Sequence, residues 1–154
     1  MRLLVVGLNP SEYAADAGVA FARPGNRFWP AALAAELVTR DRDPRHALLA
    51  HGIGLTDLAK RATPRAHWLT DAEYSAGVPR IERLVEWLRP AAVCFAGLAG
   101  YRAAIAPRAS VGWQPLTLGG RPVYAMPSSS GANPQATRGA IAAHLRAAVA
   151  GLPS

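Results

Sequence analysis

The residues best suited to chemistry lie in one N-terminal stretch, LLVVGLNPSEYAADAGVAFARPGNRFW, residues 3–29. The stretch begins as an apolar strand and breaks at GLNP, so that Asn9 comes just after the end of the strand. Open α/β folds bind ligands at the carboxyl ends of parallel strands, which makes Asn9 a candidate site residue. By itself, the dipeptide Asn9-Pro10 indicates only a turn in which the Asn side chain bonds its own backbone.

Two later segments also carry polar side chains in predicted loops. Residues 126–133, MPSSSGAN, lie between a predicted strand and the last predicted helix. Residues 52–66, GIGLTDLAKRATPRA, place Asp57 near the end of another extended segment. A Ser/Gly loop between a strand and a helix is usually a turn that leads into a helix cap, so neither segment identifies a site alone.

Taken together and in this order, the three segments resemble the mismatch-specific uracil/thymine-DNA glycosylases. In that family a G-[IL]-N-P segment ends the first strand, an aromatic residue follows at the spacing of Phe21, and N-[RH]-F-W opens the next helix. The middle segment resembles the family's G-[IV]-G-x-T-[NDK] block, and MPSSS resembles its last motif in the thymine-glycosylase form. The resemblance implies one DNA glycosylase domain over residues 1–154, with a three-layer α/β/α fold around a mostly parallel sheet.

The resemblance also implies the reaction, which is hydrolysis of the bond between a base and deoxyribose. A base inside a duplex must first be rotated into a pocket. Cleavage passes through a sugar with oxocarbenium character, and the departing uracil takes up negative charge. The family assigns the position of Asn9 to holding the attacking water, which is the catalytic role we expect here. Because a carboxamide orients water without strongly activating it, stabilisation of the leaving base should supply much of the rate.

Contacts to the flipped base follow from the same resemblance. Phe21 is expected to stack on the base, and backbone N–H groups near Leu8 and Phe21 are expected to bind its oxygens. Ser128 stands where bacterial relatives often carry Asn, and a hydroxyl offers fewer hydrogen bonds than an amide. A core aromatic is the alternative interpretation of Phe21, but the Gly/Ala-rich residues 17–20 offer little other core around it.

The end of the last motif departs from the family. Ser129 and Ser130, with the N-terminus of the final helix, are candidate phosphate contacts. After Gly131 the family carries a bulky residue that fills the hole left by the flipped base, whereas this chain has Ala132 followed by Asn133. Either the wedge is weak or Asn133 takes that role.

Asp57 is a second departure, because relatives carry Lys or Asn at this position. A carboxylate beside the pocket would assist the water or stabilise a cationic sugar. The interpretation we favour from the sequence is a helix cap or an ion-pair partner of Lys60 or Arg61.

These side chains need a scaffold of alternating strands and helices. We expect strands at residues 2–8, 52–58, 91–96, 116–118 and 123–126, and helices at residues 27–39, 44–51, 71–88, 101–105 and 135–150. Residues 9–25 are expected to form a loop. Asn26, Asp43 and Thr70 are the expected N-caps, the last in a capping box with Glu73. This alternation predicts a mostly parallel sheet covered on both faces.

The charge balance favours a polyanionic partner. The chain has 17 Lys+Arg against 10 Asp+Glu, a formal net charge of +7. A GC-biased coding sequence replaces Lys with Arg but does not create an excess of positive charge, so the excess supports binding to DNA. We expect a monomer that acts on double-stranded, mismatched or uracil-containing DNA.

No apolar run is long enough to span a bilayer. The run after Arg2 is too short for a signal peptide and lacks a cleavage site, which leads us to expect a cytoplasmic protein.

The sequence also predicts a protein without metal or cofactor. Cys94 is the only cysteine, so no disulfide forms within the chain and a cluster that needs about four thiolates is excluded. The other candidate ligands are the histidines at positions 46, 51, 67 and 144, which show no metal-ligand spacing. The interval between His46 and His51 predicts that they lie on different faces of a helix.

The leading functional hypothesis is a monofunctional DNA glycosylase that excises uracil, with thymine or other damaged bases opposite guanine as further substrates. A nucleic-acid-binding protein that keeps the fold without the activity is the alternative, and the intact Asn9 favours the enzyme. An unrelated α/β hydrolase or nucleotide-binding protein would need a G-x-S-x-G elbow or a P-loop, and the sequence contains neither.

Overall fold

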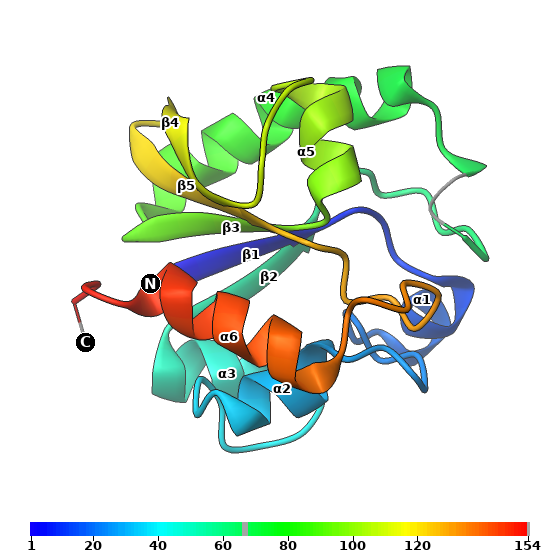
Figure 1. The fold of residues 1–154 in the computed structure, drawn as a ribbon, viewed down its shortest axis with the longest axis vertical. Coiled ribbons are helices and arrows are strands. Elements are labelled where there is room, and N and C mark those ends of the chain that lie inside the picture. The colour runs from blue at the N-terminus through cyan, green and yellow to red at the C-terminus, as the bar shows by residue number, and fades with distance from the viewer. Residues whose placement is uncertain (66–67, 154) are drawn as a thin grey trace.

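A five-stranded sheet in the order β2-β1-β3-β5-β4 forms the centre of the molecule (Figure 1). We describe residues 1–65 and 68–153 of a computed structural model. The strands are β1 (Leu3–Gly7), β2 (Ile53–Asp57), β3 (Ala92–Ala96), β4 (Gly112–Leu118) and β5 (Arg121–Met126). The first three strands and β5 are parallel, whereas β4 pairs antiparallel with β5 at the edge. The expected mostly parallel sheet is confirmed.

Helices cover both faces of this sheet, which gives the three predicted layers. They are α1 (Glu12–Ala17), α2 (Phe28–Ala34), α3 (Pro44–His51), α4 (Asp71–Leu88), α5 (Leu98–Ala104) and α6 (Arg138–Val149). Figure 1 shows α4 and α5 on one face of the sheet and α2, α3 and α6 on the other. No helix in the described residues is long and apolar enough to cross a membrane.

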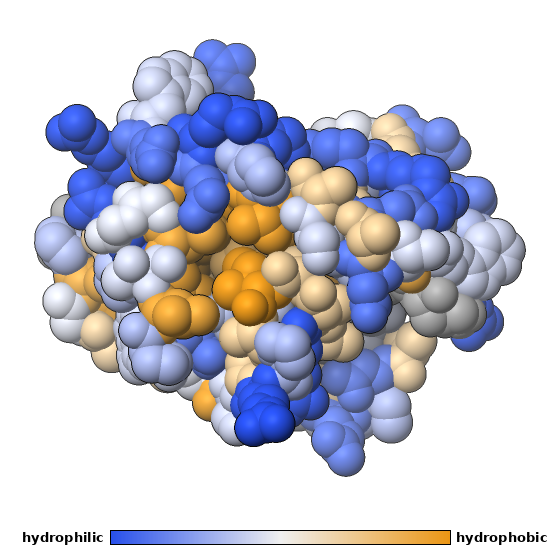
Figure 2. All heavy atoms as spheres, turned by 90° about the horizontal axis from the view of Figure 1, so that it is seen from above, coloured by the Kyte–Doolittle hydropathy of each residue, from blue (hydrophilic) through white to orange (hydrophobic). Residues whose placement is uncertain are grey.

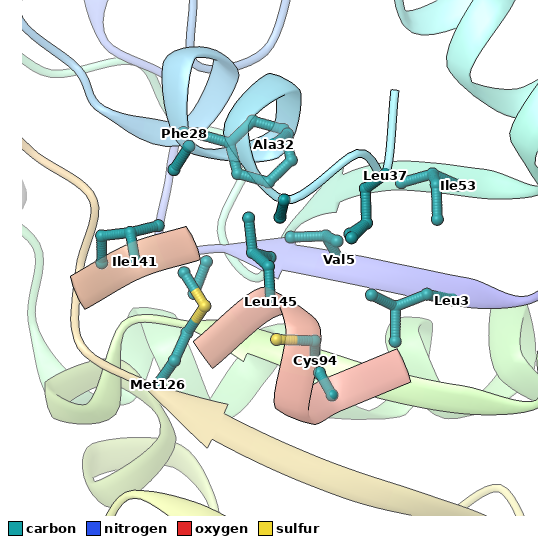
Figure 3. Close-up of a cluster of buried hydrophobic side chains, with 14 of the residues drawn as sticks. Leu3, Val5, Phe28, Ala32, Leu37, Ile53, Cys94, Met126, Ile141 and Leu145 are labelled. Atoms are coloured by element: carbon teal, nitrogen blue, oxygen red, sulfur yellow. The ribbon is translucent and has the colours of Figure 1, made fainter. Parts of the chain in front are cut away.

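The central strands β1 and β3 are buried along their whole length because helices pack on both of their sides. Alternate residues therefore enter two different cores. Leu3, Val5 and Cys94 face α2 and α6 (Figure 3), while Leu4 and Val6 face the side covered by α4. Burial raises the pKa of the Cys94 thiol to about 12, so this cysteine behaves as a small apolar residue.

The strongest local signals predicted helix boundaries correctly. Asp43 caps α3 by accepting a hydrogen bond from the backbone N–H of His46. Thr70 and Glu73 form the predicted capping box at the start of α4. Arg89 ends α4 in a left-handed conformation, directly before Pro90.

Other boundaries differ from the predictions. The loop expected at residues 9–25 contains α1, which Ser11 caps and Gly18 ends with a φ of 69°. The helix expected at residues 27–39 is shorter, because Glu36 adopts a positive φ of 59° shortly after Ala34. Asn26 precedes the formal N-cap, yet its Oδ1 still accepts the N–H of Phe28 at 2.9 Å.

Three further elements start earlier than expected. Helix α5 begins at Leu98 rather than Tyr101, β4 begins at Gly112 rather than Leu116, and β5 begins at Arg121 rather than Val123. In β4 the pairing register with β5 shifts between Trp113 and Thr117. Such an irregularity interrupts the alternation of apolar and polar residues by which a strand is recognised in a sequence.

The two histidines of α3 lie together, so the prediction that they occupy different faces is wrong. The rings of His46 and His51 are 5.3 Å apart between centroids. His51 is the last helical residue, and its Nε2 lies 3.0 Å from the Thr39 hydroxyl.

Three residues lie outside the described part of the chain. They are Ala66, the last residue of the middle motif, the histidine at position 67, and Ser154.

Candidate active site

A cleft of about 1060 Å³ opens at the carboxyl ends of the parallel strands. Each of the four parallel strands contributes a residue to the lining of the cleft. Leu8 follows β1, Asp57 ends β2, Ala96 ends β3 and Ser128 follows β5 shortly after its end. All of the predicted site residues line this cleft, namely Leu8, Asn9, Phe21, Asp57, Ser128, Ser129, Ser130, Gly131, Ala132 and Asn133. Segments far apart in the sequence thus meet where parallel sheets bind ligands.

The carboxamide of Asn9 is held by three hydrogen-bond acceptors. Its Nδ2 donates to the Thr63 hydroxyl at 2.8 Å and to the Arg61 carbonyl at 2.9 Å, with a longer bond of 3.3 Å to the Pro10 carbonyl. The Thr63 hydroxyl donates its own proton to the Arg65 carbonyl at 2.8 Å, so it can only accept from Asn9. The amide nitrogen must therefore face this side, which leaves Oδ1 for the cleft.

These contacts show that Asn9 is more than a residue bonded to its own turn. An Asx-turn residue bonds only its neighbours, and the bond to the Pro10 carbonyl is of that kind. The shorter two bonds reach 52 and 54 residues along the chain, so the side chain is positioned by the fold. Sequence analysis did not single out Thr63, which lies within the middle motif and holds the Asn9 side chain.

The segment that holds Asn9 is itself anchored to α4. Arg61 donates two hydrogen bonds of 2.9 Å to the carboxylate of Glu73. The Arg61 hydrogen bonds hold the pKa of the Glu73 carboxyl below its usual range. Glu73 also closes the capping box with Thr70, so one side chain joins the start of α4 to the support of Asn9.

Phe21 lies on the cleft in an uncommon backbone conformation. Its φ is 58°, which is rare for a bulky residue and indicates strain that the surrounding structure must maintain. The ring stacks on Phe28 with centroids 4.4 Å apart, and the indole of Trp29 donates to the Ala20 carbonyl at 2.8 Å. The ring packs on the core, as the alternative interpretation of Phe21 expected, and it also lines the cleft.

Gly7 allows Phe21 and Asp57 to meet at the end of β1. It pairs with Asp57 across the β1–β2 ladder. A Cβ atom on Gly7 would lie 2.5 Å from Asp57 Oδ1 and 3.0 Å from Phe21 Cζ. Only glycine leaves room for a carboxylate and an aromatic ring at this end of the strand.

Asp57 is buried, at 9% exposure. Burial raises the pKa of its carboxyl, and the nearby positive charges of Lys60 and Arg80 only partly oppose that shift. A group of this kind in a cleft is a candidate for a functional role.

The sequence favoured a helix cap or an ion pair for Asp57; in the described residues it forms no salt bridge with Lys60 or Arg61, although the charge of Lys60 lowers the pKa of its carboxyl. Arg61 pairs with Glu73, and Lys60 Nζ donates to the Thr56 hydroxyl at 3.3 Å. Arg80 donates to the backbone carbonyl of Asp57 rather than to its carboxylate. Nor does Asp57 cap a helix among the elements that the structure describes. Its carboxylate is therefore left at the cleft.

Leu8 connects the first strand to α5. Its side chain occupies the space where Cβ atoms on Gly97 and Gly100 would lie, the former 2.5 Å from Leu8 Cδ2. Its carbonyl accepts the N–H of Ala59 at 3.0 Å. Gly97, which precedes α5, and Gly100, which lies within it, thus allow Leu8 to pack closely against this helix.

The last-motif loop, residues 127–134, is organised by short-range hydrogen bonds. Ser128 Oγ accepts the N–H of Ser130, and Ser130 Oγ accepts the N–H of Ala132, each at 3.2 Å. Asn133 donates to the Ser128 carbonyl and accepts the N–H of Gln135. Ala132 is exposed, whereas the side chain of Asn133 is held back against the loop. This arrangement does not present Asn133 as a wedge.

Ser129 differs from the phosphate contact that we expected. It is buried, and its hydroxyl donates to Asn26 Oδ1 at 3.0 Å, while its carbonyl accepts the N–H of Arg27 at 2.9 Å. A Cβ atom on Gly131 would lie 2.8 Å from the Gly25 carbonyl. The last motif therefore docks directly on the first, and Ser130 remains the candidate phosphate contact.

Two exposed arginines stand at the rim of the cleft. Arg65 lines it, and so does Arg23, whose guanidinium donates to the Pro64 carbonyl at 3.1 Å. Positive charge beside a cleft of this size suits a polyanion that places one of its units inside.

The comparison with protein families agrees with this geometry. The model of the Uracil DNA glycosylase superfamily matches residues 1–152, nearly the whole chain. Members of this superfamily are DNA glycosylases, hydrolases that act on DNA. Because this match includes the whole sheet and the residues that line the cleft, the chain belongs to the uracil DNA glycosylase superfamily.

Proposed function

We propose that this protein is a monofunctional DNA glycosylase of the mismatch-specific uracil/thymine type, which removes uracil from DNA and prefers uracil opposite guanine. One observation carries the proposal. The Asn9 carboxamide is fixed by acceptors from a distant segment, so that Oδ1 is left for a cleft that Phe21 also lines. A fixed amide oxygen at a cleft meets the requirement for holding a water in one place.

The reaction follows from the placement of these groups. A flipped nucleotide enters the cleft, its base stacks on Phe21, and Asn9 Oδ1 accepts a hydrogen bond from a water near the anomeric carbon. The bond from that carbon to the base nitrogen breaks, and its electron pair leaves with the base. The water oxygen bonds the anomeric carbon, and its released proton balances the charge of the base. Backbone N–H groups near Leu8 and Phe21 stabilise that charge.

Asp57 has an auxiliary role in this proposal. An ionised carboxylate at the cleft stabilises the positive charge that develops on the sugar. Because burial raises the pKa of Asp57, the carboxylate becomes protonated at a higher pH than an exposed aspartate. The rate should therefore decline as the pH falls through this pKa, and Asp57→Asn should remove that part of the pH profile.

The DNA strand is held by the rim and by the last-motif loop. Ser130 and the arginines Arg23 and Arg65 supply hydrogen bonds and charge to phosphates. Ser128 contacts the base or the adjacent phosphate, and Ala132 faces the gap in the duplex. A formal net charge of +7 supports contacts that weaken steeply with salt through counterion release.

The decisive experiment is a panel of labelled duplexes and single strands that carry uracil, thymine or hypoxanthine opposite guanine or adenine. Abasic sites are revealed by alkali after single-turnover incubation, and Asn9→Ala is the control for contaminating glycosylase. We expect excision of uracil, faster opposite guanine than opposite adenine. Tight, salt-dependent binding to these duplexes without abasic sites would instead establish the inactive binding protein.

A further inference from the structure

A second hollow lies apart from the cleft, between the end of α5 and the edge strand β4. It has a volume of about 580 Å³ and is lined by residues 106–111 and 113–116 together with Tyr101. Figure 2 looks onto this face of the molecule and shows apolar atoms gathered around a hollow. We call this hollow the groove. Ala99 and Ala103 of α5 line the cleft, whereas Tyr101 of the same helix lines the groove, so the two sites are separate.

The exposed side chains of the groove are unusually apolar. Val111, Trp113 and Leu116 are 46%, 47% and 51% exposed, and all three line it. A contiguous apolar patch on a protein surface commonly marks an interaction site. Scattered single residues would carry no such implication.

The groove is also preformed. Gln114 Nε2 donates to the carbonyls of Ser110 and Gly112 at 2.7 and 2.8 Å, which fixes the loop before β4. Arg102 Nε donates to the Ala109 carbonyl at 2.7 Å and ties the same loop to α5. The Trp113 ring stands edge-on to Tyr124, with centroids 5.4 Å apart. A groove held in this way does not require ordering when a ligand binds.

The charge of the groove indicates the chemistry of its partner. In the described part of the chain its lining contains one charged side chain, Arg108, and no acidic residue. A partner with apolar anchors and negative charge matches this surface. A single cation is too few for a nucleic-acid strand, whose phosphates need a row of them.

A second copy of the chain fits the groove poorly. Each copy carries a net charge of +7, so two groove faces repel each other. Pairing along the free edge of β4 is obstructed by Pro115, which lacks an N–H, and by the register shift around it. The partner must therefore bind through its side chains rather than as an added strand.

We propose that this groove is a docking site for an acidic peptide segment of another protein, anchored by aromatic or aliphatic side chains. The segment places its apolar side chains between Val111, Trp113 and Leu116, and a carboxylate meets Arg108. Because the groove and the cleft are separate, the segment binds while DNA occupies the cleft. The inference concerns a surface outside the active site and does not depend on the proposed activity.

The test uses a displayed library of random heptapeptides, panned against the full chain with excess duplex DNA to occupy the cleft. We expect enrichment of peptides that combine Asp or Glu with Phe, Trp, Leu or Ile. Binding of an enriched peptide, followed by fluorescence anisotropy, should weaken at least tenfold in Arg108→Glu and in Leu116→Gln. Arg23→Glu, an equal charge change at the cleft rim, is the matched control and should leave peptide binding unchanged.

Three results would overturn the proposal. They are a failure to enrich acidic apolar peptides, equal loss of binding in Arg23→Glu and Arg108→Glu, and self-association in sedimentation that Leu116→Gln abolishes. The last would assign the groove to a second copy. Far-ultraviolet circular dichroism and an unchanged Tm in Arg108→Glu and Leu116→Gln establish that these variants are folded.

Discussion

The two walls of the cleft are held by different kinds of contact. On the first-motif wall, the bonds that hold Asn9 span 52 and 54 residues of sequence. In the last-motif loop Ser129 is tied to Asn26, 103 residues away, but around Ala132 at the loop tip three side-chain bonds span two residues and one spans five. Long-range contacts fix a geometry as firmly as the fold itself, whereas a local turn can rearrange while the fold stays intact. We therefore call the first-motif side the rigid wall, suited to chemistry, and the loop tip around Ala132 the adaptable wall, suited to DNA.

The largest effect is expected from the rigid wall itself. Asn9→Ala should raise the activation free energy of uracil excision by about 2–4 kcal/mol, which lowers the single-turnover rate roughly thirtyfold to a thousandfold, as for a lost transition-state group. Affinity for DNA should change little, because Asn9 is not at the basic rim. A variant with a near wild-type rate would break the assignment of this wall to chemistry.

The next effect tests whether long-range support matters. Thr63→Val keeps the shape of the side chain but removes the hydroxyl that accepts from Asn9. We expect a rate loss of about 10- to 100-fold, since small displacements of a positioning group are costly. Thr63→Ser, which keeps the hydroxyl, should recover most of the rate with the same affinity for DNA. Equal rates in the two variants would mean that the hydroxyl does not orient Asn9.

A smaller effect is expected on the adaptable wall. Flipping a base costs a few kcal/mol, least when the base is mispaired or unpaired. Ala132 is too short to fill the gap, so Ala132→Leu should raise excision several-fold on a U:A duplex and hardly at all on single-stranded DNA. Ala132→Ser, similar in size, is the matched control. No gain on U:A, together with equal wild-type rates on U:G and U:A, would show that another residue already fills the gap.

The smallest expected effect is on stability rather than rate. The pKa of Asp57 is raised in the folded state, so its contribution to stability is favourable at acid pH and is lost as the pH rises through that pKa. Asp57→Asn should therefore raise the Tm by a few degrees at pH 7, and the gain should shrink as the pH is lowered.

The same variant should excise uracil more slowly if the carboxylate assists the reaction. Excision and Tm, measured on one preparation over the same pH range, separate the two roles. A fall in Tm at neutral pH would show that Asp57 supports the fold instead.

Local signals in the sequence predicted the elements that carry the site. Apolar runs predicted β1 and β3, and short capping patterns predicted the starts of α3 and α4. These features depend on neighbouring residues, which a single sequence displays directly. The candidate residues were proposed because they lie in motifs that resemble those of a known family, most of them at or soon after a strand end.

Features that depend on tertiary contact were not predicted. The acceptors that orient Asn9 come from a segment that joins the first motif only in the folded chain. Likewise, the burial of Ser129 results from its bond to Asn26, 103 residues away. Short elements such as α1 were missed because six residues carry too little periodicity to be recognised.

The single thiol in the middle of the sheet can serve as a natural probe of unfolding. Cys94 lies on β3 between β1 and β5, fully buried, with a pKa of about 12. An alkylating reagent reaches it only when the central strands separate, so the labelling rate measures opening of the whole domain rather than fraying of a loop. A cysteine introduced at the groove or at the rim of the cleft would react at once, without background from the native thiol.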